Sequence, residues 1–102
     1  MREWISTIRK SPGSTASWLL IRNDLKTLQQ EVGGRIETTT LMKDLAVVSN
    51  ADMIFSNLPF NCSLCGVQFF GTILLVGTEG EELTNPPVEV DYGTLFPQLW
   101  RD

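Results

Sequence analysis

Histidine is absent from this chain of 102 residues, and cysteine is present only twice. Without an imidazole, a Ser-His-Asp or Cys-His relay cannot form, which excludes the common mechanisms of nucleophilic hydrolysis. Two cysteines cannot by themselves complete the four-ligand shell of a structural zinc ion. The chain also lacks a glycine-rich phosphate loop. We therefore expect a non-enzymatic protein with no catalytic residues and no cofactor.

Long hydrophobic runs are missing as well. The longest, residues 69–77, is far shorter than the ~20 residues that cross a bilayer, and residues 1–10 lack the apolar centre of a signal peptide. A composition of 42% hydrophobic and 20% charged residues is that of a globular chain, and this length suits one domain. We expect a single domain over residues 1–102, located in the cytoplasm and without a membrane partner.

Basic side chains are scarce in the second half of the chain. Residues 1–43 carry a net charge of +3, whereas residues 44–102 carry −7, for a total of −4. An acidic surface repels nucleic acid and favours basic partners, including the nucleic-acid grooves of other proteins; a solvated face without a partner is the alternative. The acidic side chains that could form a partner-binding surface are Glu79, Glu81, Glu82, Glu89 and Asp91.

One helix is expected over residues 24–34. Asn23 or Asp24 can cap it, and apolar residues at 25, 28 and 32 recur with helical periodicity. Gly33 suits a left-handed helix stop and Gly34 a sharp exit. The same two glycines could approach an anion, but anion sites use the N-terminus of a helix and these glycines follow a C-terminus. A helix with one apolar face should lie across a sheet.

The remaining segments suggest strands. Residues 1–22 read as N-terminal strands around the Pro12-Gly13 turn signal, residues 35–77 as a sheet, and residues 78–102 as an acidic, proline-containing tail. Residues 67–76 are expected to form one central strand, in which Gly71 would make a bulge or allow a close backbone approach. The fold class is therefore α+β, a small, mostly antiparallel sheet with one helix packed on one face. The side chains that could dock the tail are Leu95, Phe96, Leu99 and Trp100.

Cys62 and Cys65 form a C-x-x-C pair, which leaves three interpretations open. The thiols can pack without a ligand, they can share a metal ion across a homodimer, or they can form a redox pair. A redox role calls for a following helix, and residues 66–67 show no sign of one. A metal site within one chain is not expected.

Other polar and aromatic residues are candidates for contacts to a ligand. Gln29 and Glu37, if buried, serve either as structural clamps or as ligand contacts. Trp18, beside two leucines, is expected in the core rather than stacked on a base, and Asn50 and Asn61 are expected to form turns. A small-molecule site, if one exists, would use Arg22, Gln29, Gly33, Gly34, Arg35 and Glu37.

Five short motifs carry a family resemblance: L-Q-Q-E-V-G-G-R-I-E from residue 28, L-A-V-V-S-N from 45, N-L-P-F-N from 57, G-T-I-L-L-V-G from 71 and E-E-L-T from 81. With its L-Q-x-x-V-G-G-x-I-E core, the chain resembles a family of small uncharacterised proteins of phages, plasmids and other mobile elements. The resemblance implies an accessory protein acting in the cytoplasm of a bacterial host. It favours an inhibitor of a host defence system such as CRISPR, which would contact a nucleic-acid-binding effector through the acidic surface. The alternative is a binder that sequesters a nucleotide immune signal.

Overall fold

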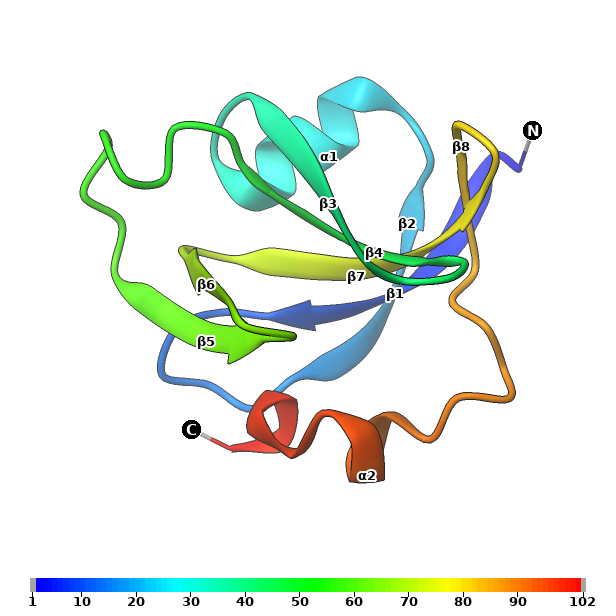
Figure 1. The fold of residues 1–102 in the computed structure, drawn as a ribbon. Helices are drawn as coiled ribbons and strands as arrows, with labels where there is room; N and C mark the ends of the chain where they lie inside the picture. The colour runs from blue at the N-terminus through cyan, green and yellow to red at the C-terminus, as the bar shows by residue number, and fades with distance from the viewer. Residues whose placement is uncertain (1, 102) are drawn as a thin grey trace.

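A mostly antiparallel β-sheet dominates the computed structural model, which describes residues 2–101 (Figure 1). The strands and helices, in chain order, are β1 (Trp4–Lys10), β2 (Ser17–Arg22), α1 (Leu25–Val32), β3 (Ile36–Met42), β4 (Leu45–Asn50), β5 (Phe60–Leu64), β6 (Val67–Phe70), β7 (Ile73–Glu79), β8 (Glu82–Thr84), α2 (Tyr92–Leu95) and the 3-10 turn η1 (Pro97–Trp100). The main sheet has the order β2-β1-β7-β4-β3, with β8 also paired to β7, and β5 and β6 form a separate hairpin. Every strand pair between these elements is antiparallel.

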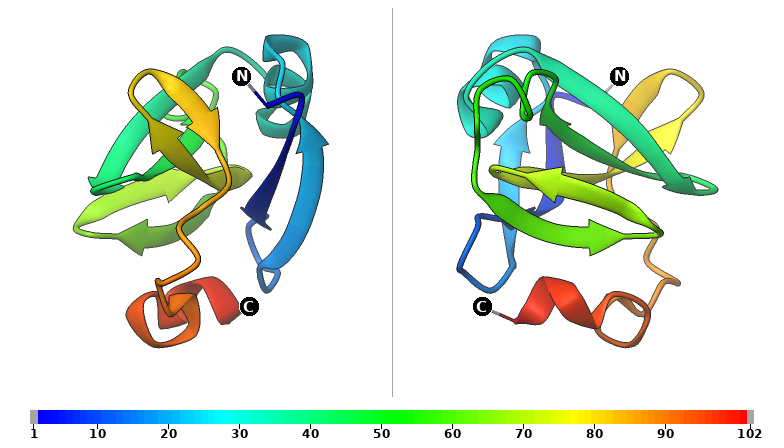
Figure 2. Two further views of the ribbon diagram at one scale, coloured as in Figure 1. Left: turned by 90° about the vertical axis from the view of Figure 1, so that its right-hand side faces the viewer. Right: turned by 60° about the vertical axis from the view of Figure 1, so that its left-hand side comes forward.

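Both faces of the main sheet are buried. Alternate residues of β4 and β7 point to opposite sides, so that Leu45 and Leu75 belong to one hydrophobic cluster and Ala46 and Val76 to another. Helix α1 covers the second cluster, while the β5–β6 hairpin and the C-terminal segment cover the first (Figure 2). The expectation of one helix on one face is confirmed for α1, but the second layer was not predicted.

The cap and the stop predicted for the helix are confirmed in α1, and Leu28 and Val32 are buried, but Leu25 of the predicted apolar face is 58% exposed. The Asp24 carboxylate accepts a hydrogen bond from the Thr27 N–H at 2.8 Å, and this bond lowers the pKa of Asp24. Gly33 ends the helix with φ of 79°. Gly34 is required for a different reason, because a Cβ there would lie 2.9 Å from Nδ2 of Asn50. That amide donates to the Val32 carbonyl at 3.2 Å, so the second glycine lets Asn50 hold the end of the helix.

The single central strand predicted over residues 67–76 is wrong. The chain breaks at Gly71, which has φ of 80°, and β6 and β7 belong to different sheets. A Cβ at Gly71 would lie 2.7 Å from Cδ1 of Leu58. The Gly71 carbonyl accepts a hydrogen bond of 2.7 Å from the Asn61 side-chain amide. The same amide donates to the Lys10 carbonyl at 2.8 Å. Asn61 therefore clamps the break from a buried position instead of forming a turn.

The predicted tail is also partly sheet. Residues 78–84 complete β7, turn at Gly80 and return as β8, so the irregular segment begins only at Asn85. We call residues 85–91 the strap; it runs from β8 down to α2 (Figure 1). Beyond the strap, Phe96 and Leu99 are buried and dock the C-terminal segment, as predicted, whereas Leu95 is exposed.

Candidate protein-binding surface

The acidic residues predicted from the sequence lie on the β7–β8 hairpin and on the strap. Glu79 and Glu82 are opposite each other in the last pair of the hairpin, with Glu81 in the turn. Glu79, Asp44 and Glu89 line one hollow of about 380 Å³, and Glu81 and Glu82 line a neighbouring hollow of about 230 Å³. All five carboxylate side chains are exposed. We call Asp44, Glu79, Glu81, Glu82 and Glu89 the acidic surface.

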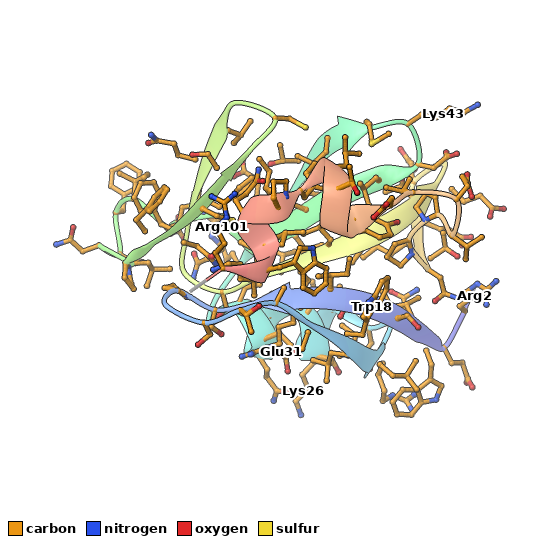
Figure 3. All side chains as sticks on the ribbon, turned by 90° about the horizontal axis from the view of Figure 1, so that it is seen from below. Arg2, Trp18, Lys26, Glu31, Lys43 and Arg101 are labelled. Atoms are coloured by element: carbon orange, nitrogen blue, oxygen red, sulfur yellow. The ribbon has the colours of Figure 1, made fainter. Side chains whose placement is uncertain are left out.

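These carboxylates carry no ion pair within the part of the chain that the structure describes. The three ion pairs of residues 2–101 join Arg9 to Glu31 at 2.8 Å, Arg22 to Asp24 at 3.4 Å and Arg35 to Asp52 at 2.7 Å. Arg2 lines the same hollow but donates to the Thr84 hydroxyl at 3.0 Å. Arg2 and Lys43 lie toward one end of the molecule and Arg101 away from them (Figure 3). Within residues 2–101 the acidic surface therefore forms no ion pair, although Arg2 lines one of its hollows.

Asp91 has a structural task instead. Its carboxylate accepts hydrogen bonds from the backbone N–H and the hydroxyl of Thr94, at 3.1 and 2.9 Å, and so caps α2. These bonds lower the pKa of Asp91. Asp44, which the sequence reasoning missed, takes its place at the acidic surface. It has φ of 63° in the β3–β4 turn, and its carbonyl accepts from the Thr78 N–H at 3.1 Å, a long-range contact with no local sequence signal.

The residues proposed for a small-molecule site do not all lie together: Arg22 is at the N-terminal end of α1 and the others are at or beyond its C-terminal end. Arg22 precedes α1 and pairs with Asp24, whereas Arg35 follows the opposite end of α1 and pairs with Asp52. The Arg35 guanidinium lowers the pKa of Asp52. The Gln29 carbonyl accepts from the N–H groups of both Gly33 and Gly34, at 2.8 and 3.0 Å, so those amides are engaged in the helix stop. Glu37 is exposed on the edge strand β3.

The two cysteines point to different environments. Cys62 is buried within the first cluster, and this burial raises the pKa of its thiol against the opposing effect of Lys10. Cys65 is exposed, with φ of 50°, and forms a tight hairpin turn with Gly66 at φ of 80°. Both thiols are free. Residues 2–101 contain no cluster of three or more side chains that could ligate a metal ion.

An aromatic groove lies beside the acidic surface. Trp18 was expected in the core, but 53% of it is exposed, because β2 is an edge strand and the strap covers only part of its face. The rings of Trp18 and Tyr92 meet edge to face, with centroids 5.7 Å apart and planes at 81°. With the strap they line a groove of about 320 Å³. Its further lining residues are Ser6, Asn85, Pro86, Pro87, Val88 and Val90.

Hydrogen bonds fix the wall of the aromatic groove. The Ser6 N–H donates to Oδ1 of Asn85 at 2.8 Å, which ties the start of the strap to β1. The Tyr92 hydroxyl donates to the Pro87 carbonyl at 2.6 Å, and the Trp100 indole donates to the Tyr92 carbonyl at 3.0 Å. Burial, together with the nearby Glu89 carboxylate, raises the pKa of Tyr92 to about 12. The groove is thus a preformed feature with a carboxylate close to it.

The chain belongs to the family described as a domain of unknown function (DUF3846), whose model matches residues 5–96. This match confirms the resemblance to an uncharacterised family and extends it nearly to both ends of the chain. No curated protein and no solved structure matches the chain. Within the described residues, the structure contains no helix long and apolar enough to cross a membrane.

Proposed function

We propose that this member of the family is a non-enzymatic binding protein, which occupies a basic, nucleic-acid-binding surface of another protein through the acidic surface. The observation that carries the proposal is the pattern of ion pairs: Asp44, Glu79, Glu81, Glu82 and Glu89 are exposed and form no ion pair within residues 2–101. Carboxylates arranged in this way present negative charge where a phosphate backbone would otherwise lie.

The setting we propose is a phage, plasmid or other mobile element, with a defence effector of the bacterial host, such as a CRISPR complex, as the partner. A nucleic-acid-binding effector has a positively charged channel, and a ligand that fills this channel competes with the effector's target. Occupation by contact needs no catalytic residue, in keeping with a chain that has no histidine. The interaction would be steered by long-range charge attraction and weakened by salt.

A competition assay tests the proposal. Purified protein is titrated into CRISPR effector complexes, and binding of their target DNA is measured by mobility shift at low and at physiological ionic strength. We expect target DNA to be displaced, more strongly at low salt. The double variant Glu79→Lys/Glu89→Lys should lose at least about tenfold in potency, since each reversal replaces an attraction by a repulsion. Glu37→Lys makes one such reversal on edge strand β3, outside the hollows lined by the acidic surface, and is the control for each single reversal.

Three results would contradict the proposal. They are displacement that is insensitive to salt, an equal loss of potency in Glu37→Lys and in the double variant, and absence of displacement across effectors of several classes. The alternative of nucleotide sequestration finds no support in the geometry, because Arg22 and Arg35 lie at opposite ends of α1 and each is already paired with an aspartate.

A further inference from the structure

The aromatic groove contains exposed ring surface that the acidic-surface proposal does not use. Trp18 lies on edge strand β2 and is 53% exposed, while Tyr92, 8% exposed, forms the adjoining wall. The volume of about 320 Å³ is at the lower end of the ~300–1,000 Å³ typical of ligand pockets. The groove is therefore suited to one side chain of a partner and not to an extended molecule.

Trp4, a second tryptophan in the β1–β2 hairpin, has an arginine guanidinium over its ring. Trp4 is paired with Arg22 across β1 and β2, and the Arg22 guanidinium carbon lies 5.3 Å from the centre of its ring. Trp18 lies on the same strand pair, opposite Ile8, and has no cation of its own among the described residues. One tryptophan of the hairpin is thus supplied with an arginine from within the chain, and the other is not.

Charge near the groove favours a cation as the missing contact. Glu89 lies between Val88 and Val90, which both line the groove, and it lines two adjoining hollows, one shared with Val88 and the other with Val90. Burial, and then the Glu89 charge, raise the pKa of Tyr92 in the groove wall. Glu89 is exposed and forms no ion pair within residues 2–101. A guanidinium can stack on an aromatic ring and bind a carboxylate with two parallel hydrogen bonds at the same time, which an ammonium cannot do.

We infer that Trp18, Tyr92 and Glu89 form a recognition site for one arginine side chain of the partner. The guanidinium stacks on the exposed Trp18 ring and donates to the Glu89 carboxylate, while the methylene stem packs against Val88. This inference rests on the proposed function, because it assigns to the basic partner one defined anchor beside the diffuse attraction of the acidic surface. Arginine anchors buried against aromatic rings are among the residues that dominate interface energies.

A small probe separates this site from general charge attraction. The blocked tripeptide N-acetyl-Gly-Arg-Gly-amide is titrated into the full-length ¹⁵N-labelled protein, and the three tryptophan indole signals are followed by NMR. The same peptide with citrulline replaces the guanidinium by an uncharged group of equal shape. We expect saturable shifts of the Trp18 indole and of the Val88 and Val90 amides with the arginine peptide, and at least about tenfold weaker binding of the citrulline peptide.

Variants place the binding at the groove. Trp18→Leu should weaken the arginine peptide about tenfold, and Glu89→Gln should weaken it several-fold without removing any ring. The controls are Trp4→Leu, which changes the tryptophan that already has an arginine, and Glu37→Gln, which removes a distant carboxylate; both should bind as the wild type does. Glu89→Gln also decides the matter if Trp18→Leu folds poorly, because an exposed amide in place of a carboxylate leaves the core unchanged.

Three results would overturn the inference: equal binding of the citrulline peptide, shifts confined to the β7–β8 hairpin, or unchanged affinity in both Trp18→Leu and Glu89→Gln. Binding of an apolar peptide or a second copy at the groove in preference to arginine would do the same. The proposed function has its own test in the displacement of target DNA. An effector that is displaced equally well by wild type and Trp18→Leu would refute the arginine site while leaving the acidic surface in place.

Discussion

Gly77 is the residue through which β7 supports the strap, and Gly77→Ala is the most informative perturbation of this fold. An added Cβ would lie 2.0 Å from the Asn85 carbonyl oxygen, 2.6 Å from its carbon and 3.1 Å from the Pro86 nitrogen. All three are main-chain atoms, so no side-chain rotation relieves the contact. The strap must therefore move away from the sheet by more than an ångström in order to reach ordinary van der Waals separation.

The expected cost follows from what that movement disturbs. Overpacking a filled site costs about 1–3 kcal/mol. Displacement of the strap also weakens the Ser6 to Asn85 bond of 2.8 Å and the Tyr92 to Pro87 bond of 2.6 Å, each contributing about 0.5–1.5 kcal/mol. We expect Gly77→Ala to lower the free energy of unfolding by about 2–4 kcal/mol and to open the aromatic groove.

Urea denaturation followed by tryptophan fluorescence measures the first effect, and the shift of the Trp18 indole signal reports the second. Gly93→Ala is the matched control: it lies in α2, where the nearest atom to an added Cβ is 3.5 Å away, an ordinary contact. The control should be neutral or stabilising by about 0.4–1 kcal/mol. A Gly77→Ala protein within about 0.5 kcal/mol of the wild type, with an unchanged Trp18 signal, would refute the described packing of the strap.

Three further predictions concern the interior. The pKa of the single tyrosine, Tyr92, is raised to about 12 from an unfolded value near 10. The stability that this shift contributes is therefore present below pH ~10 and lost as the pH rises toward 12. A titration of phenolate absorbance against pH will measure the raised pKa. In the native protein a thiol reagent should modify the exposed Cys65 quickly, and the buried Cys62 only as fast as the fold opens locally and exposes its thiol. Equal rates of modification would contradict the burial of Cys62. Asn50→Ala should lower the free energy of unfolding by about 1–3 kcal/mol in thermal denaturation, since it strands the Val32 carbonyl and the Asp52 N–H, bonded at 3.2 and 2.7 Å.

Local sequence signals were sufficient where local physics decides the structure. Asp24, the apolar spacing of α1 and Gly33 together predicted the helix and its end, because capping and the left-handed stop act within a few residues. The turn at Pro12-Gly13 predicted the β1–β2 hairpin for the same reason. The charge asymmetry of the chain likewise located most of the acidic surface, since side chains on a tight hairpin and a strap are exposed whatever packs beneath them.

Long-range packing decided what the sequence could not predict. Residues 67–76 look like one apolar strand, yet Gly71 is held in a left-handed conformation by Leu58 and Asn61, which approach from outside that segment. Asp44 joins the acidic surface through its carbonyl, which accepts a hydrogen bond from the Thr78 N–H across the sheet. Thr78 is far from Asp44 in the sequence and gives no local signal, whereas the capping of α2 by Asp91 and Thr94 is a local pattern like that of Asp24 and Thr27, which the sequence analysis did not use.

Trp18 was predicted to lie in the core, and its exposure in the structure points to a candidate site. A tryptophan followed by two leucines belongs in the core if the strand is internal, but β2 is an edge strand, and the strap leaves half of the Trp18 side chain uncovered. Trp4, on the neighbouring strand, is exposed to a similar extent, at 48%, and has an arginine of its own. An exposed apolar patch rimmed by polar residues often marks a site of contact, and here the Trp18 ring adjoins a groove rather than standing alone. The exposed ring, the unpaired Glu89 and the preformed groove therefore belong to one surface, and an arginine satisfies all three at once.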